Sequence, residues 1–248
     1  MLFHIFAILS VAVFGSCIAE KFDLLVPTCA RNSSDYNSCL KHAIKEAWPL
    51  FVAGLPAEFE FPPIDPFIYE SDKYVFDNGG LHGEVTISNL TAEGLRLIRF
   101  VAIRTHFDDD IFRLAIDIRI PKIVTYGDCA AYGVFSGFRM GGKGKLYLTL
   151  EGIRGTWDIS GPVKNDTWII EHFRTSPIVK SFNLKLDNFF EGNRELNELA
   201  HKFVNDNWPP IYRIVVQVSS DVWDTYFSKM LNRLFSKLSF SKVFPEEV

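Results

Sequence analysis

The most restrictive feature of this sequence is an apolar stripe at helical spacing near its C-terminus. Apolar residues recur at steps of three and four over about 46 residues from Asn193, the periodicity of a helix with one buried face. Unbroken, such a helix would reach roughly 70 Å, far longer than an ordinary globular helix. The chain must therefore supply an equally long apolar surface for it. The stripe consists of Leu196, Leu199, Phe203, Ile211, Ile214, Val215, Val218, Val222, Tyr226, Met230, Leu234 and Leu238.

Four earlier segments, in which apolar and polar residues alternate, predict that surface. A period of two is typical of strands with one buried side and one solvent-facing side. The segments are residues 81–88, 112–120, 145–151 and 182–187. We therefore expect an α+β fold in which an antiparallel meander wraps the long helix.

Prolines modify both predicted helices. The Pro209-Pro210 pair should kink the long helix near Asn207 or divide it in two. A shorter amphipathic helix is predicted over Leu40–Val52, with Ser38 available as its cap. Pro49 should distort its last turn.

The N-terminus has the pattern of a secretory signal peptide. Residues 1–14 are apolar and contain no Lys, Arg, Asp or Glu, and the run is shorter than the ~20 residues that a spanning helix needs. Cys17 and Ala19 resemble the small pair that precedes a cleavage site. We expect a signal peptide over residues 1–19, a single domain over residues 20–248, and a secreted, extracellular protein without a membrane span.

Secretion changes what the cysteines can do. After cleavage, Cys29, Cys39 and Cys129 remain, and the oxidising route allows one pair of them to form a disulfide. Cys29 and Cys39 would close a small polar loop, so this pairing is favoured. A bridge from either one to Cys129 remains the alternative, because sequence does not fix connectivity. If Cys129 stays unpaired, it is more often a buried thiol than a reactive one.

Three sequons also fit a secreted glycoprotein. They begin at Asn32, Asn89 and Asn165, and any that are used should lie in surface turns.

Composition narrows the possible partners. The net charge is -4, and Lys and Arg are dispersed rather than gathered in a basic stripe, so nucleic acid is not expected as a partner. The 23 phenylalanines supply enough large apolar surface to line a cavity as well as a core.

Two stretches resemble enzyme motifs, but each departs from the motif at a residue that the chemistry needs. The stretch Gly137–Gly144 has the spacing of a phosphate loop, but Gly144 stands where a Ser or Thr must reach the metal. A hairpin tip is the better interpretation. Ser136 lies in GVFSG, which is not the G-x-S-x-G of a nucleophile elbow.

Metal patterns fail in the same way. No two histidines have metal-ligand spacing. The run Asp108–Asp110 lacks the Gly and distal Glu of a calcium loop and is interpreted as a tight turn between two strands. We therefore expect no catalytic residue, metal or cofactor, and an esterase acting on a bound lipid is the weakest hypothesis.

Several further segments stand in a characteristic order along the whole mature chain. They are the paired Cys29 and Cys39, Gly54-Leu55-Pro56, Pro62–Pro66, Leu81-His82-Gly83, Pro121 followed by Tyr126–Gly133, Leu184–Leu196 and Val243-Phe244-Pro245. Together they resemble the takeout / juvenile hormone binding protein family of secreted insect proteins. Because Cys129 has no free partner for a second disulfide, the chain is more similar to the takeout-like branch.

The resemblance implies a particular architecture. In this TULIP-like fold, a highly curved antiparallel sheet wraps a long helix and leaves an apolar tunnel that holds a lipid-like ligand. It also implies that the N-terminal bridge anchors the first helix near one end of the tunnel.

The first functional hypothesis is therefore a monomeric carrier of a small or elongated hydrophobic ligand, such as a juvenile hormone-like terpenoid, a fatty acid or a quinone. The alternative is a secreted interaction module with a filled core. Half of the expected ligand contacts could instead be core, and a one-residue register error would exchange the strand faces. Expected contacts, taken from the helix stripes and one strand face, are Trp48, Phe51, Val52, Phe112, Leu114, Ile116, Ile118, Phe203, Ile211 and Val215.

Overall fold

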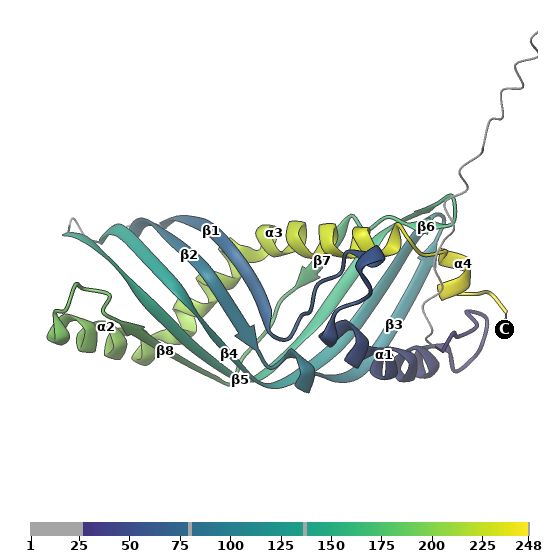
Figure 1. Cartoon of the computed structure of the whole chain (residues 1–248), viewed down its shortest axis with the longest axis horizontal. Helices are drawn as coiled ribbons and strands as arrows, with labels where there is room; N and C mark the ends of the chain where they lie inside the picture. Colours follow the sequence, from purple (N-terminus) through teal and green to yellow (C-terminus); the bar gives the residue numbers. More distant parts are fainter. Residues whose placement is uncertain (1–26, 79–80, 136–137, 248) are drawn as a thin grey trace, which may run out of the picture.

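Two very long strands set the shape of the molecule. The computed structural model describes residues 27–78, 81–135 and 138–247, so the expected signal peptide over residues 1–19 lies outside it. β4 (Ile111–Phe135) has 25 residues and β5 (Phe138–Lys164) has 27. They pair antiparallel along almost their whole length, and each has a contour length of roughly 80 Å. The result is the elongated, strongly curved sheet of Figure 1.

Shorter strands flank the two halves of this central pair. Near the start of β4 the sheet is completed by β3, with β7 on the far side of β5. Near the end of β4 it is completed by β2 and then β1, with β8 beside β5. The bounds are β1 Phe67–Asn78, β2 Leu81–Glu93, β3 Arg99–Asp108, β6 Thr167–Trp168, β7 His172–Thr175 and β8 Ser181–Asp187.

The alternating segments are confirmed as strands, since they lie in β2, β4, β5 and β8. The long helix is divided, as the proline pair predicted. α2 (Arg194–Asp206) ends just before Asn207, and α3 (Trp208–Phe235) begins just after it. Pro209 and Pro210 lie in the first turn of α3, where a missing N–H costs no helical hydrogen bond.

The first helix begins earlier than predicted. α1 spans Tyr36–Ala53, and Asp35 occupies the position before it. The prediction of Ser38 as the cap was wrong, because Ser38 already lies inside the helix. Three short helices complete the secondary structure of the described residues: η1 Ala57–Phe59, η2 Leu95–Leu97 and α4 Phe240–Val243.

The helices lie along the sheet in a fixed order. α1 and α4 lie at one end of the molecule, α2 lies at the other, and α3 runs between them (Figure 1). Within residues 27–78, 81–135 and 138–247, no helix combines the length and apolarity needed to cross a bilayer.

A polar row on α2 fastens this helix to the free edge of β8. The side-chain amide of Asn205 accepts from the N–H of Leu184 and donates to its carbonyl, both at 2.8 Å. One turn earlier, His201 Nε2 lies 2.6 Å from the N–H nitrogen of Leu186. Another turn earlier, Asn197 accepts from the N–H of Phe189 at 3.0 Å. The row thereby satisfies backbone groups that an edge strand would otherwise leave open.

α3 is fastened to the segment around β7 by the same device. Asn232 accepts from the N–H of Ile170 at 2.8 Å and donates to its carbonyl at 2.7 Å. Two turns earlier, Asp224 accepts from the N–H of Phe173 at 2.6 Å and lies 3.1 Å from His172 Nδ1. Burial of Asp224 opposes ionisation, but these hydrogen bonds outweigh it, and the net pKa of this carboxyl is lowered.

The end of the molecule near α1 and α4 is packed with aromatic rings. Phe112 lies 4.9 Å from the ring of Trp168, 5.1 Å from Phe240 and 4.9 Å from Phe244. Trp168 donates its indole N–H to the Gly161 carbonyl at 3.1 Å, so its polar atom is satisfied in the core. This aromatic cluster closes one end of the space between sheet and helices.

Two turns were predicted between strands. The turn at Asp108–Asp110 is confirmed, since β3 ends at Asp108 and β4 begins at Ile111. The expected hairpin tip at Gly137–Gly144 extended too far, because residues from Phe138 onward already belong to β5. A Cβ at Gly144 would lie 2.3 Å from the Asp187 carbonyl, so close approach of the chain explains this glycine.

Ion pairs cover much of the outer sheet face, opposite to the core. Arg104 donates to both carboxylate oxygens of Asp117 at 2.6 and 2.8 Å, and Thr156 donates to the same carboxylate at 2.7 Å. The hydrogen bonds from Arg104 and Thr156 lower the pKa of Asp117 to about 2, although burial opposes this. Arg113 pairs with Asp158 in the same bidentate way.

The Asp117 pair predicts a loss of stability in acid. A folded-state pKa below the unfolded value gives stability that is present above about pH 4 and is lost as the pH falls toward 2. Because Arg104 is more than half exposed, we expect only about 1 kcal/mol. Asp117→Asn should lower the free energy of unfolding by that amount near neutral pH and by about half of it near pH 3. Urea titrations at both pH values measure this, with Asp109→Asn in the β3–β4 turn as the control.

Candidate functional site

A partly enclosed apolar cavity of about 220 Å³ lies between α1, the C-terminal half of α3 and the concave side of the sheet. Apolar residues from every layer of the fold contribute to its wall. Its lining comprises Ile44, Trp48, Phe51, Phe61, Ile64, Phe67, Leu95, Phe100, Leu114, Ile116, Trp157, Ile159, Trp168, Phe173, Thr175, Phe227, Met230, Leu231, Leu234 and Phe235.

α1 presents Trp48 to the cavity at the centre of an aromatic group. The Trp48 ring lies 5.3 Å from Phe100, edge to face, and 5.8 Å from Trp157. Its indole N–H donates to the carbonyl of Leu95 at 3.0 Å. The polar atom of Trp48 is therefore committed to η2, and only the apolar ring surface faces a ligand.

α3 supplies the opposite wall. Phe227, Met230, Leu231 and Leu234 follow one another at steps of three and one, which places them on one helix face. The Phe227 ring lies 4.8 Å from Phe173 of β7. Because Asp224 and Asn232 hold the same helix to the β7 segment, this wall is fixed by hydrogen bonds as well as by packing.

The cavity wall is almost free of polar side chains. Thr175 is the one hydroxyl-bearing residue in the lining, and the lining contains no Lys, Arg, Asp, Glu or His. An ionised ligand group inside would lose its hydration without a charged partner, which costs several kcal/mol or more. The cavity therefore favours neutral, apolar ligands with at most one group that accepts or donates a hydrogen bond.

The structure places four of the expected ligand contacts in this wall: Trp48, Phe51, Leu114 and Ile116. Three others are packed beside the cavity rather than in its lining. Phe112 and Ile118 are buried in the main core, and Val52 packs against the neighbouring cluster around Phe61.

The three expected contacts from the N-terminal part of the long helix lie elsewhere. Phe203 on α2 is 61% exposed, and Val215 on α3 is 50% exposed. Ile211 lies one turn before Val215, and none of the three belongs to the cavity lining. Ligand contact at these three positions stays a prediction. The position of the cavity does not support it.

Several lining residues escaped the sequence interpretation. Phe67, Phe100, Trp157 and Phe173 lie on strands or strand segments that gave no clear alternation. Phe227 had a usable signal, because it stands three residues before Met230, a member of the helical stripe.

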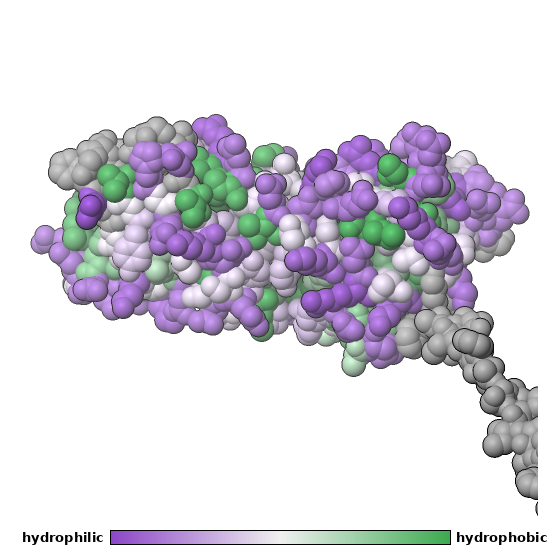
Figure 2. Space-filling model, turned by 90° about the horizontal axis from the view of Figure 1, so that it is seen from above, coloured by the Kyte–Doolittle hydropathy of each residue, from purple (hydrophilic) through white to green (hydrophobic). Residues whose placement is uncertain are grey.

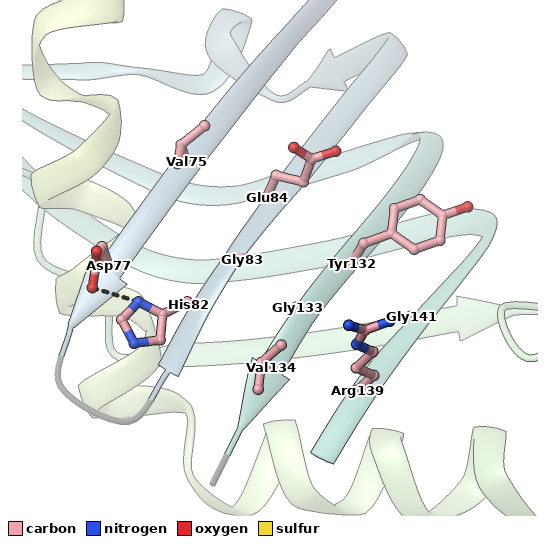
Figure 3. Close-up of a pocket in the computed structure, with 10 residues that line it drawn as sticks. All are labelled: Val75, Asp77, His82, Gly83, Glu84, Tyr132, Gly133, Val134, Arg139 and Gly141. Atoms are coloured by element: carbon pink, nitrogen blue, oxygen red, sulfur yellow. Dashed lines mark ion pairs between the residues drawn. The ribbon is translucent and has the colours of Figure 1, made fainter. Parts of the chain in front are cut away.

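A second depression, of about 750 Å³, crosses the outer ends of β1, β2, β4 and β5 (Figure 3). It is larger than the cavity but open, and it carries an exposed pair in which His82 Nδ1 lies 2.6 Å from Asp77 Oδ1. Glu84, Tyr132 and Arg139 also line it. None of its ten lining residues is Ser, Thr or Cys, so the depression offers this histidine no nucleophile of the kind found in a Ser or Cys hydrolase.

Seen from above, the surface of the molecule has no single large apolar area. In that view hydrophobic residues form several separate areas on a largely hydrophilic surface (Figure 2). Scattered exposed apolar side chains are normal for a folded protein. The partly enclosed cavity, with its almost wholly apolar lining, is the stronger candidate for binding.

The cysteines adopt the favoured pairing. Cys29 and Cys39 form a disulfide, and Cys129 is free. Burial raises the pKa of the Cys129 thiol to about 11, so it stays protonated at physiological pH and is a poor nucleophile.

A curved antiparallel sheet around a long helix, with an apolar cavity between them, defines a class of wrapped-helix proteins with an internal binding space. The chain belongs to the haemolymph juvenile hormone binding protein (JHBP) family, whose family model matches residues 6–245. This confirms the family resemblance seen in the sequence.

One solved structure supports the fold. The crystal structure of Epiphyas postvittana Takeout 1 matches with a TM-score of 0.70 and 21% identity, covering 88% of this chain and 99% of that one. At this identity the match concerns the fold alone. A lipopolysaccharide binding protein structure matches with a TM-score of only 0.30 at 13% identity, covering 78% of this chain and 37% of that one. No curated protein sequence matches this chain significantly.

Proposed function

We propose that the protein is a carrier that binds a small hydrophobic ligand in the cavity between α1, α3 and the sheet. The observation that carries this proposal is a partly enclosed cavity of about 220 Å³ with an uncharged lining. A filled core, as the interaction-module hypothesis requires, would leave no such space. Affinity would come from apolar area removed from water, at about 25 cal/mol per Å².

The lining also discriminates between ligand classes. A fatty acid at neutral pH would need a cation or several donors at its carboxylate, and the lining offers Thr175 alone as a hydroxyl donor. A neutral terpenoid ester or a comparable neutral lipid needs neither. We therefore propose a neutral terpenoid-like ligand, which is consistent with a family named for juvenile hormone binding.

Secretion, glycosylation and binding without catalysis belong to the same proposal. The disulfide between Cys29 and Cys39 supports passage through an oxidising compartment. Asn32, Asn89 and Asn165 are all exposed, as glycan attachment requires. The cavity lining contains no carboxylate, histidine or cysteine, which supports binding of the ligand without chemical change.

Extraction of the native protein tests the proposal most directly. The protein, purified from a secreting insect-cell culture, is extracted with organic solvent, and the extract is analysed by mass spectrometry. A neutral lipid in stoichiometric amount is the expected result. In parallel, a neutral fluorescent terpenoid probe should bind more tightly than an anionic fatty-acid probe. Absence of any lipid, together with no binding of either probe, would refute the carrier function.

Filling the cavity should abolish most binding. Ile116 lines the cavity on β4, and Ile116→Trp would place an indole in the ligand space. Losing ~60 Å² of apolar contact already costs about 1.5 kcal/mol, so affinity for the neutral probe should fall by more than about tenfold. Probe titration measures this loss.

The matched control is Ile111→Trp, the same change at an exposed position of the same strand. It should bind the probe like the wild type. Overpacking at Ile116 costs about 1–3 kcal/mol of stability, so urea unfolding of both variants checks that each remains folded. Unchanged probe binding by a folded Ile116→Trp variant would place the ligand outside this cavity.

A further inference from the structure

A row of three arginines crosses the outer face of the sheet. Arg99, Arg119 and Arg154 occupy directly paired positions on β3, β4 and β5. Directly paired residues share one face, and like charges in such pairs destabilise a sheet. Neighbouring strands are about 4.8 Å apart, so three guanidinium groups emerge within about 10 Å of one another.

Among the described residues, four other cations on this face are each paired with a carboxylate, whereas the three row arginines are not. Arg104 pairs with Asp117, Arg113 with Asp158, Lys122 with Glu151 and Lys145 with Asp128. In residues 27–78, 81–135 and 138–247, no carboxylate lies within ion-pair distance of the three row arginines or of Arg174. The row therefore carries a local positive charge on a protein whose net charge is -4.

Exposed apolar side chains adjoin the same arginines. Arg154 forms a β-bridge with Ile178, which is 65% exposed. An exposed apolar residue therefore lies next to Arg154 at the end of the arginine row. A shallow groove of about 530 Å³ on this face is lined by Arg119, Arg154, Arg174, Ile178 and the exposed Val101. Its carboxylates, those of Asp117 and Asp158, are already held in the bidentate pairs.

Unpaired guanidinium groups beside exposed aliphatic side chains match the interface of an anionic bilayer. Arginine binds phosphate oxygens with a planar fork of donors, and aliphatic side chains enter the boundary between headgroups and acyl chains. We propose that this cationic row, defined by Arg99, Arg119, Arg154 and Ile178, docks the protein on membrane surfaces that bear anionic lipid headgroups. Docking of this kind brings a cavity protein to a source or a destination of apolar molecules.

Vesicle flotation tests the proposal. The full secreted chain is mixed with vesicles of phosphatidylcholine alone or of phosphatidylcholine with phosphatidylserine, at low and at physiological salt. We expect binding to the anionic vesicles only, weakening as salt rises. Each arginine near an anionic surface contributes about a fivefold increase in partitioning. Arg119→Gln/Arg154→Gln should therefore reduce partitioning by about 25-fold, and Ile178→Ser should reduce it further.

The control removes two positive charges elsewhere. Lys143→Gln/Lys185→Gln changes the exposed lysines of the other half of the sheet, and it should change partitioning by less than the arginine pair does. Equal binding to neutral and anionic vesicles, or equal losses in both double variants, would overturn the proposal. Loss of binding to a sulfated glycan column by the arginine variant, without any vesicle binding, would assign the row to glycans instead. Titration with the neutral terpenoid probe keeps this outcome separate from the carrier function, since the arginine variant should bind the probe normally.

Discussion

Phe112→Ala should destabilise the protein by about 3–5 kcal/mol, the range for removing a large buried aromatic side chain. Phe112 is 1% exposed, and its ring contacts Trp168, Phe240 and Phe244. Deleting it would leave a void among rings that cannot collapse, because β4 and α4 hold them in place. Urea unfolding followed by tryptophan fluorescence and circular dichroism measures the loss.

Phe203→Ala is the matched control, since it removes the same side chain from an exposed position on α2. It should change the free energy of unfolding by less than about 0.5 kcal/mol. Both residues were expected from sequence to contact ligand. If Phe112→Ala is instead nearly neutral for stability and lowers probe binding, Phe112 belongs to the binding space and not to the aromatic cluster that closes its end.

The contrast between these two phenylalanines shows what local patterns can predict. Alternation along β4 separated an apolar set from a polar set and left open which of them faces inward. In the structure the apolar set is buried: Phe112, Leu114, Ile116 and Ile118. The alternation did not indicate where along the inner face the cavity begins and ends. Only Leu114 and Ile116 reach it, because the extent of the cavity depends on α1 and α3, which approach from distant parts of the sequence.

Strands that depart from a strict period of two were missed for a physical reason. In β3 the pairing with β4 shifts between Phe100 and Ala102, so Phe100 and Ile103 are both buried although they are three residues apart. A bulge of this kind moves later side chains to the opposite parity. A search for strict alternation therefore overlooks a strand that contributes Phe100 to the cavity wall.

The helices illustrate the opposite difficulty. The apolar stripe predicted the buried face of the C-terminal half of α3 correctly, with Leu234 at 2% exposure. On α2 the polar residues Asn197, His201 and Asn205 contact the sheet, whereas Leu199 and Phe203 are exposed. The edge of β8 requires hydrogen-bonding partners, and this tertiary demand decides which face of α2 is turned inward.

The N-terminal bridge provides the second large expected effect. Cys29 and Cys39 are ten residues apart, and closing a loop of this size stabilises by about 2 to 3 kcal/mol in the chain-entropy picture. Cys29 is buried in the main core, and Cys39 lies in the first turns of α1. Cys29→Ala/Cys39→Ala should therefore lower the free energy of unfolding by that amount while the far-ultraviolet circular dichroism changes little.

Loss of the bridge should also speed the release of ligand. α1 carries Trp48 and Phe51 into the cavity wall, and its N-terminal end is tied to the body by the bridge and by the bond from the Arg31 N–H to the Pro245 carbonyl. With one of these ties removed, α1 should move away from the cavity more often, so the neutral probe should dissociate several-fold faster in stopped-flow displacement. Wild-type protein treated with reductant provides the control and should behave like the double variant. Global unfolding of the variant would show that the bridge holds the whole fold, and an unchanged dissociation rate in a folded variant would show that α1 does not limit release.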